Sequence, residues 1–285
     1  MAPTRYELDT APAPVRSTSA GISTLLPGPV APLTWTTAGA AIEFAMRIAC
    51  CSTLPLLPWP RPGREWAMTA LVDGRGVFDA DLLDEATLRI AEHPRRTALR
   101  AARARRAAER RGDAGLVLAT TMRDGRSFQV MSERTVDDLL LTSSRLLDVL
   151  FRVLADHAGT SLVGRVSRRE VATGADIASA VALDRPLPLW QLEAPGAGVT
   201  RTVGERPGPA GAAAAIAAAE LKATVDELGR RWSETPALDA GVDVAYLRWD
   251  ELPEVAGGRI DAAGCHERVS RRKAQLAECS SEHAS

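Results

Sequence analysis

The sequence predicts a mainly α-helical protein with one small β element near residues 66–78. Alanine is abundant and aromatic residues are few, at 4%, and an alanine- and leucine-rich chain favours helices. Several segments repeat apolar residues at helical spacing, whereas "WAMTALVDGRGVF" combines a β-prone run with a turn signal at Asp73-Gly74. The chain has 285 residues, 46% of them hydrophobic, which is enough to bury a large core.

The N-terminal half contains two predicted helical regions. Apolar residues recur at helical spacing over residues 36–51, and the proline-rich "PLLPWPRPG" that follows ends this helix. After the β element, either Asp79 or Asp81 is suited to cap the next helical region, over residues 80–111. Pro94 is expected to break that region into two parts.

The clearest helical pattern covers residues 133–158, where apolar residues form one broad face. The pattern leaves open whether this helix continues to Glu170. A shorter helix is predicted over residues 174–183, and two more over residues 210–232 and 261–279. The stretch between the helices predicted over residues 174–183 and 210–232 is rich in proline and glycine and is typical of a loop.

The chain is expected to form one domain over residues 21–279. Residues 1–20 are rich in proline, alanine, serine and threonine and predict an extended or disordered lead-in, and residues 280–285 form a tail. The four cysteines lack disulfide or zinc spacing, which favours idle thiols in a reducing compartment. With no signal pattern and no uninterrupted apolar span, we expect a cytoplasmic protein without a membrane partner.

The net charge of −1 gives no overall reason to expect a nucleic-acid partner. Residues 95–111 hold eight arginines, a pattern that is compatible with phosphate or nucleic-acid binding. Because neither lysine nor an aromatic residue is interleaved, we interpret the run as a solvated helix face. The sequence therefore predicts no nucleic-acid partner.

No sequence motif of a known catalytic or metal site is present. The phosphate-binding glycine loops, the G-x-S-x-G elbow and the H-E-x-x-H zinc motif are missing, so no catalytic residue and no metal ligand are predicted. His157 is interpreted as a histidine favoured by the dipole at a helix C-terminus. Asp250 and Glu251 are adjacent and are not expected to share a proton, since adjacent helical residues do not face each other.

Two separated segments carry a family resemblance. "STLLPGPVAPLTWT", residues 23–36, resembles the opening of the central domain of the PEP-utilising phosphotransferases, which include rifampicin phosphotransferase and PEP synthase-like proteins. "LGRRWSETPALDAGVDVAYLRWDEL", residues 228–252, is similar to a segment near the other end of that domain. The two matches have the right order and spacing, so the resemblance spans about residues 20–278.

The resemblance implies a helical domain that binds the acceptor of a phosphoryl group. Complete members of the family also have an ATP-grasp domain that splits ATP and a swivelling domain with a phosphorylated histidine in a T-x-S-H-type motif. This sequence contains neither. The resemblance thus implies a stand-alone acceptor-binding component that works with separate ATP-grasp and phosphohistidine proteins. The component itself binds no cofactor, since ATP and Mg belong to the partner chain, and its acceptor is a small organic compound.

The expected substrate-binding residues lie in the two matching segments. A proline-rich loop is rigid, and an apolar wall suits an organic ligand, while guanidinium groups match phosphate bidentately. The candidates are Pro27, Gly28, Pro32, Leu33, Thr34, Trp35, Arg230 and Arg231. Two other interpretations stay open: the loop fills the helical core with Trp35 buried, and the arginines are a solvated helix end. The alternative function is a non-catalytic small-molecule-binding or scaffold protein.

The stretch before the second segment departs from the family pattern. Relatives tend to carry basic residues near the acceptor site there, whereas residues 208–219 read "GPAGAAAAIAAA". This difference predicts either another kind of acceptor or a domain that has lost its phosphate-handling role.

Overall fold

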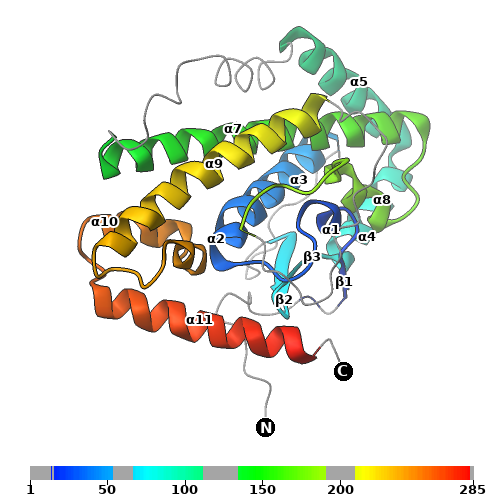
Figure 1. Cartoon of the computed structure of the whole chain (residues 1–285). Helices are drawn as coiled ribbons and strands as arrows, with labels where there is room; N and C mark the ends of the chain where they lie inside the picture. The colour runs from blue at the N-terminus through cyan, green and yellow to red at the C-terminus, as the bar shows by residue number, and fades with distance from the viewer. Residues whose placement is uncertain (1–13, 15, 54–66, 112–133, 191–208, 283–285) are drawn as a thin grey trace.

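The computed structural model describes residues 14, 16–53, 67–111, 134–190 and 209–282 (Figure 1). Most of the expected lead-in, the proline-rich residues 55–63, much of the loop before residue 209 and the last three residues lie outside this description. The described chain is mainly helical with a small β element, as the sequence predicted, and this element is part of a three-stranded sheet.

The sheet is antiparallel, with the strand order β1-β3-β2. β2 (Thr69–Val72) and β3 (Arg75–Asp79) form the expected hairpin, and Asp73 and Gly74 have φ values of 49° and 71°. Two successive positive φ values match a type I′ turn, whose twist suits adjacent strands. β1 (Ser17–Thr18) was not predicted, because two residues carry no periodic pattern.

The first long helical segment begins earlier than predicted. α1 (Ile22–Leu25) precedes the proline loop, and α2 (Pro32–Thr34) then starts a helix at a proline, which is tolerated in the first turn. One π-helical turn, Trp35–Gly39, connects α2 to α3 (Ala40–Thr53). In this turn, the hydroxyl groups of Thr36 and Thr37 donate hydrogen bonds to main-chain carbonyls of the preceding turn.

The predicted cap and break of the next region are confirmed. Asp79 caps α4 (Ala80–Glu92), since its carboxylate accepts a hydrogen bond of 3.1 Å from Leu82 N. α5 (Pro94–Arg111) begins at Pro94. Proline is tolerated there because an N–H group at the first position of a helix has no hydrogen-bond acceptor within the helix.

The central helix runs ten residues beyond the shorter of the two predicted ends. α7 (Val136–Arg168) starts at a capping box between Thr135 and Asp138 and stops at Arg169, whose φ of 60° is left-handed. The remaining elements are α8 (Gly174–Ala178), the 3-10 turn η3 (Ser179–Val181), α9 (Pro209–Glu234), the 3-10 turns η4 (Gly241–Tyr246) and η5 (Trp249–Glu251), α10 (Leu252–Ala256) and α11 (Ala262–Glu282).

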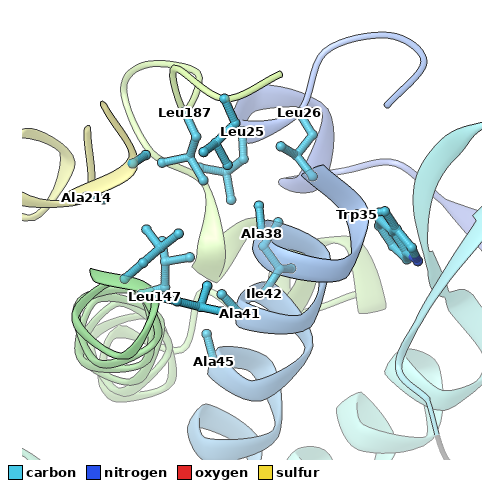
Figure 2. Packing of buried hydrophobic residues seen from close by; sticks show 14 of the residues in the cluster. Leu25, Leu26, Trp35, Ala38, Ala41, Ile42, Ala45, Leu147, Leu187 and Ala214 are labelled. Carbon is cyan, nitrogen blue, oxygen red and sulfur yellow. The ribbon is translucent and has the colours of Figure 1, made fainter. Parts of the chain in front are cut away.

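α7, the longest described helix, packs against both α3 and α9 and runs across the upper part of the view in Figure 1. Small residues make the close approach possible: Ala41 and Ala45 of α3 lie near Leu147 of α7 (Figure 2). The alanine tract of α9 also has a buried face, made by Ala213, Ala214, Ala217 and Ala218. The alanine tract therefore has a packing role.

α11 lies on the side of the protein opposite α7 and contacts η4 (Figure 1). Most of the buried apolar side chains form one cluster that includes Ile22 near one end of the described chain and Leu276 near the other. None of the described helices is both long enough and apolar enough to cross a membrane.

Candidate functional site

The proline loop, residues 25–35, is attached to other parts of the protein at Leu25 and at Val30. Val30 N donates to Gly74 O at 2.9 Å, and Leu187 N donates to Leu25 O at 3.0 Å. Pro27 is exposed and Gly28 is half-buried with a φ of 79°, whereas the other residues of the loop are buried. Of the candidates in this loop, Pro27 and Gly28 are therefore the ones that a ligand can reach.

Trp35 is part of the packed interior. Its ring lies against Gly39 of the π-helical turn and Gly76 of β3, where an added Cβ would be 2.5 and 2.9 Å from ring carbons. Its indole is 9% exposed and faces the sheet (Figure 2). The burial of Trp35 agrees with the interpretation that the loop fills the core.

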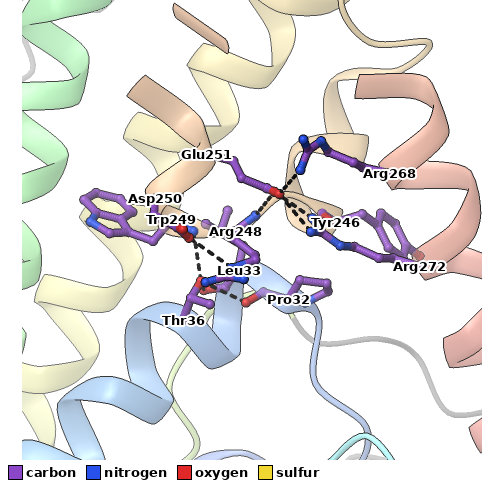
Figure 3. A network of polar contacts seen from close by, with 10 residues as sticks. All are labelled: Pro32, Leu33, Thr36, Tyr246, Arg248, Trp249, Asp250, Glu251, Arg268 and Arg272. Atoms are coloured by element: carbon purple, nitrogen blue, oxygen red, sulfur yellow. Dashed lines mark hydrogen bonds and ion pairs between the residues drawn. The ribbon is translucent and has the colours of Figure 1, made fainter. Parts of the chain in front are cut away.

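The threonine hydroxyls of the loop region join distant parts of the chain. Thr34 Oγ1 donates to Trp190 O at 2.6 Å and is fully buried. Thr36 Oγ1 donates to Pro32 O and accepts from Trp249 N, both at 2.9 Å (Figure 3). The Trp249–Thr36 bond spans 213 sequence positions and brings the two segments that carry the family resemblance into contact.

Glu251 is the centre of the polar network next to this contact (Figure 3). Arg272 donates to both of its carboxylate oxygens, at 2.7 and 2.8 Å, and also to Tyr246 O. Arg268 and the main-chain N–H of Arg248 donate to it at 2.8 Å each. Burial raises the pKa of Glu251, but the hydrogen bonds from Arg272 and Arg248 and the nearby positive charges outweigh it, so the pKa is lowered.

The predicted phosphate-binding arginines make contacts within the protein. Arg230 pairs with Glu227 and Glu234, and Arg231 pairs with Glu227 at 2.9 Å and donates to Arg134 O. Hydrogen bonds from Arg230 and Arg231 lower the pKa of Glu227 to about 2, against an opposing effect of burial. Glu227 therefore accepts hydrogen bonds from both guanidinium groups, and the side chain of Arg230 is about half exposed.

A polar cluster that the sequence reading missed lies beside the proline loop. Trp190, whose carbonyl accepts from Thr34, donates through its indole Nε1 to Asp226 Oδ1 at 2.7 Å. Asp226 also pairs with Lys222, whose Nζ lies 5.9 Å from the centre of the Trp190 ring. Both charged side chains are partly exposed, so an ammonium and a carboxylate group are accessible together. The spacing of Lys222 and Asp226 on a predicted helix was a visible signal, whereas their contact with Trp190 was not.

Two interpretations of single residues meet different outcomes. The expectation for His157 was wrong: α7 continues past it, and its Nε2 lies 2.8 Å from Ala182 O, so it connects α7 to the segment after η3. Asp250 and Glu251 form ion pairs with different side chains, Asp250 with Arg248 and Glu251 with Arg272 and Arg268.

The accessible features of these segments are the loop tip, Pro27 and Gly28, and the partly exposed Lys222–Asp226 pair. An ammonium group can attract a phosphate or carboxylate, and a carboxylate can accept a hydrogen bond from a hydroxyl. Within the described ranges, no group of histidine, cysteine and acidic side chains has an arrangement that would hold a metal ion. No protein-family model matches the chain, and no curated protein or solved structure is significantly similar to it.

Proposed function

We propose that this chain is the acceptor-binding component of a split phosphotransferase of the PEP-utilising type. One observation supports the proposal most strongly: the two segments that resemble the family's central domain lie against each other, through the Trp249–Thr36 hydrogen bond of 2.9 Å. Segments that together define a domain are expected to meet in space even when they are far apart in the sequence. Separate ATP-grasp and phosphohistidine proteins would supply the phosphoryl group.

The acceptor would bind at the exposed tip of the proline loop and at the Lys222–Asp226 pair. Lys222 provides a positive charge for a phosphate or carboxylate, and Asp226 is placed to accept a hydrogen bond from an acceptor hydroxyl. Trp190 holds Asp226 through its indole N–H and adds an apolar wall. A small organic compound with a hydroxyl group and an anionic group fits this chemistry.

A second function, a non-catalytic scaffold, is favoured by a different observation. Thr34 and Trp35 are buried, and the hydroxyl group of Thr34 donates its hydrogen bond within the protein. Arg230 and Arg231 both form ion pairs with Glu227. A domain that had lost phosphoryl transfer would retain such contacts because they stabilise the fold.

Capture of the tagged chain from the cells that make it, after mild cross-linking, distinguishes the two functions. The phosphotransferase proposal predicts that an ATP-grasp or phosphohistidine protein is enriched, as identified by mass spectrometry. Free tag and an unfolded variant of the chain serve as controls. If neither type of protein is enriched above these controls, the split-enzyme proposal fails and the scaffold function is favoured.

A further inference from the structure

α5 carries a dense positive charge that the proposed function does not use. Residues Pro94–Arg111 include eight arginines and one glutamate, a local charge of +7, in a chain whose net charge is −1. Thr97 and Ala101 are fully buried on the inner side of the helix, which packs against α3 and α7. Arg95, Arg96 and Arg103 are exposed, and α5 lies at one end of the protein (Figure 1).

Several exposed arginines on other helices of the described chain form ion pairs. Arg230 on α9, for example, is neutralised by Glu227. Over the described ranges, no carboxylate forms an ion pair with Arg95, Arg96 or Arg103. Their charges therefore face solvent without a compensating anion from the described chain and are available to an external one.

From this placement we propose that the outer face of α5 binds the phosphate backbone of duplex DNA, without sequence specificity. Guanidinium groups match phosphate oxygens bidentately, and duplex DNA presents one negative charge per about 1.7 Å of its axis. Residues 95–106 extend over about 16 Å of helix, at about 1.5 Å per residue. An α-helix fits the major groove of DNA, whereas the major groove of duplex RNA is deep and narrow.

The helix is less suited to other polyanions. Insertion into a membrane surface requires an apolar face opposite the basic one, and in α5 that face is packed against α3 and α7. Leu99 is exposed on the outer side, but it is a single apolar residue among arginines. The inference replaces the expectation of no nucleic-acid partner, which rested on a charge averaged over the whole sequence and on the lack of interleaved aromatic residues.

Binding of a fluorescent 30-base-pair duplex of mixed sequence, measured by anisotropy as salt is raised, tests the inference. Contacts with three to four phosphates predict that log Kobs falls with log salt with a slope of about −3. The triple variant Arg95→Gln, Arg96→Gln, Arg103→Gln should lose tenfold or more in affinity at low salt, and its slope should be shallower by about 2 to 3. Glutamine forms helices about as readily as arginine, so the fold should be preserved, which circular dichroism checks.

A control variant separates a local surface from net charge. It carries the same loss of three charges at exposed, scattered positions: Arg75→Gln, Arg185→Gln and Arg259→Gln. The inference predicts less than a twofold change in DNA affinity for this control. Equal losses in the two triple variants, no DNA binding by the wild-type protein at low salt, or tighter binding to duplex RNA, an acidic polypeptide or anionic phosphatidylserine vesicles would each overturn it.

Discussion

Arg272 and Glu251 form a bidentate ion pair inside the protein. The side chain of Arg272 is fully buried, and its two Nη atoms lie 2.7 and 2.8 Å from the two carboxylate oxygens of Glu251. The pair joins α11 to η5, next to the bond between Trp249 and Thr36 (Figure 3). It is therefore expected to hold the C-terminal helix against the two segments that resemble the PEP-utilising family.

Replacing Arg272 should strongly destabilise the fold. Arg272→Met leaves the carboxylate of Glu251 buried with fewer donors, and removing one partner of such a pair costs about 3 kcal/mol or more. The neighbouring Arg271→Met is the matched control, because Arg271 is exposed and its pair with Glu267 is worth less than about 1 kcal/mol. Urea unfolding measures both free energies. Equal values for the two variants would show that the buried pair does not stabilise the protein.

The stability of the protein should fall in acid. Hydrogen bonds from Arg230 and Arg231 lower the pKa of Glu227 to about 2, below its ordinary value of 4.5. A carboxyl group with a lowered pKa stabilises the folded state above the ordinary pKa, and this contribution disappears as the pH falls toward the folded-state pKa. The free energy of unfolding should thus decrease between about pH 5 and pH 2.

Glu227→Gln should reduce this dependence on pH and lower the stability at pH 7. Glu267→Gln, on the exposed side of α11, should leave the slope nearly unchanged. Urea unfolding at a series of pH values gives both slopes. A Glu227→Gln slope equal to that of the wild-type protein would contradict the role given to the pair with Arg230 and Arg231.

Replacing Ser143 by alanine should stabilise the protein. Within the described chain, Ser143 Oγ on α7 is fully buried and has no hydrogen-bond partner, which costs about 1 to 3 kcal/mol. The adjacent Ser144 is exposed and donates to Leu140 O at 3.0 Å, so Ser144→Ala controls for helix propensity. Thermal unfolding should show a higher Tm for Ser143→Ala than for Ser144→Ala. The opposite order would mean that the hydroxyl of Ser143 is satisfied.

Gly39 should not tolerate a side chain. A Cβ at this position would lie 2.5 Å from the Trp35 ring, which is itself held against β3, so Gly39→Ala should cost about 2 kcal/mol through overpacking. Gly159→Ala on α7 has open space, and alanine is the better helix former, so that variant should gain about 0.5 to 1 kcal/mol. Chemical unfolding gives the free energy of unfolding of each variant. Similar changes for Gly39→Ala and Gly159→Ala would contradict the tight packing of Trp35.

Local features of the fold were predictable from the sequence, whereas long-range contacts were not. The cap at Asp79 and the break at Pro94 follow from the chemistry of single residues. The sequence left the end of the central helix open between residue 158 and Glu170, and α7 ends at Arg168, close to the longer alternative. The apolar pattern continues into this last part, where Leu162, Val163 and Val166 are buried.

In the candidate site, too, local features were predictable from the sequence and long-range contacts were not. The proline loop and the "WDEL" segment were recognised separately, but their contact depends on a main-chain N–H of Trp249, which no side-chain pattern encodes. The burial of Trp35 depends on two glycines from different elements, Gly39 and Gly76. The ion pairs of Arg230 and Arg231 involve a glutamate three and four positions earlier, and this spacing was visible in the sequence.

The proposed function gives a role to the tip of the proline loop. Gly28 and Gly258 have φ values of 79° and 70°, and a Cβ at either position meets open space. Alanine should cost each position about 1 kcal/mol in stability, since L-residues disfavour this conformation. Gly28→Ala should also impair acceptor binding, whereas Gly258→Ala should not. The two variants are therefore a matched pair for a functional assay.

The most direct test of the acceptor-binding proposal is transfer of phosphate from radiolabelled ATP to a small-molecule extract of the same cells by the captured complex. The proposal predicts a labelled low-molecular-weight product that requires both ATP and this chain, that forms with Gly258→Ala and that decreases several-fold with Gly28→Ala. A product that forms equally well without this chain, or no product from a complex that contains the ATP-grasp and phosphohistidine proteins, would contradict the proposal.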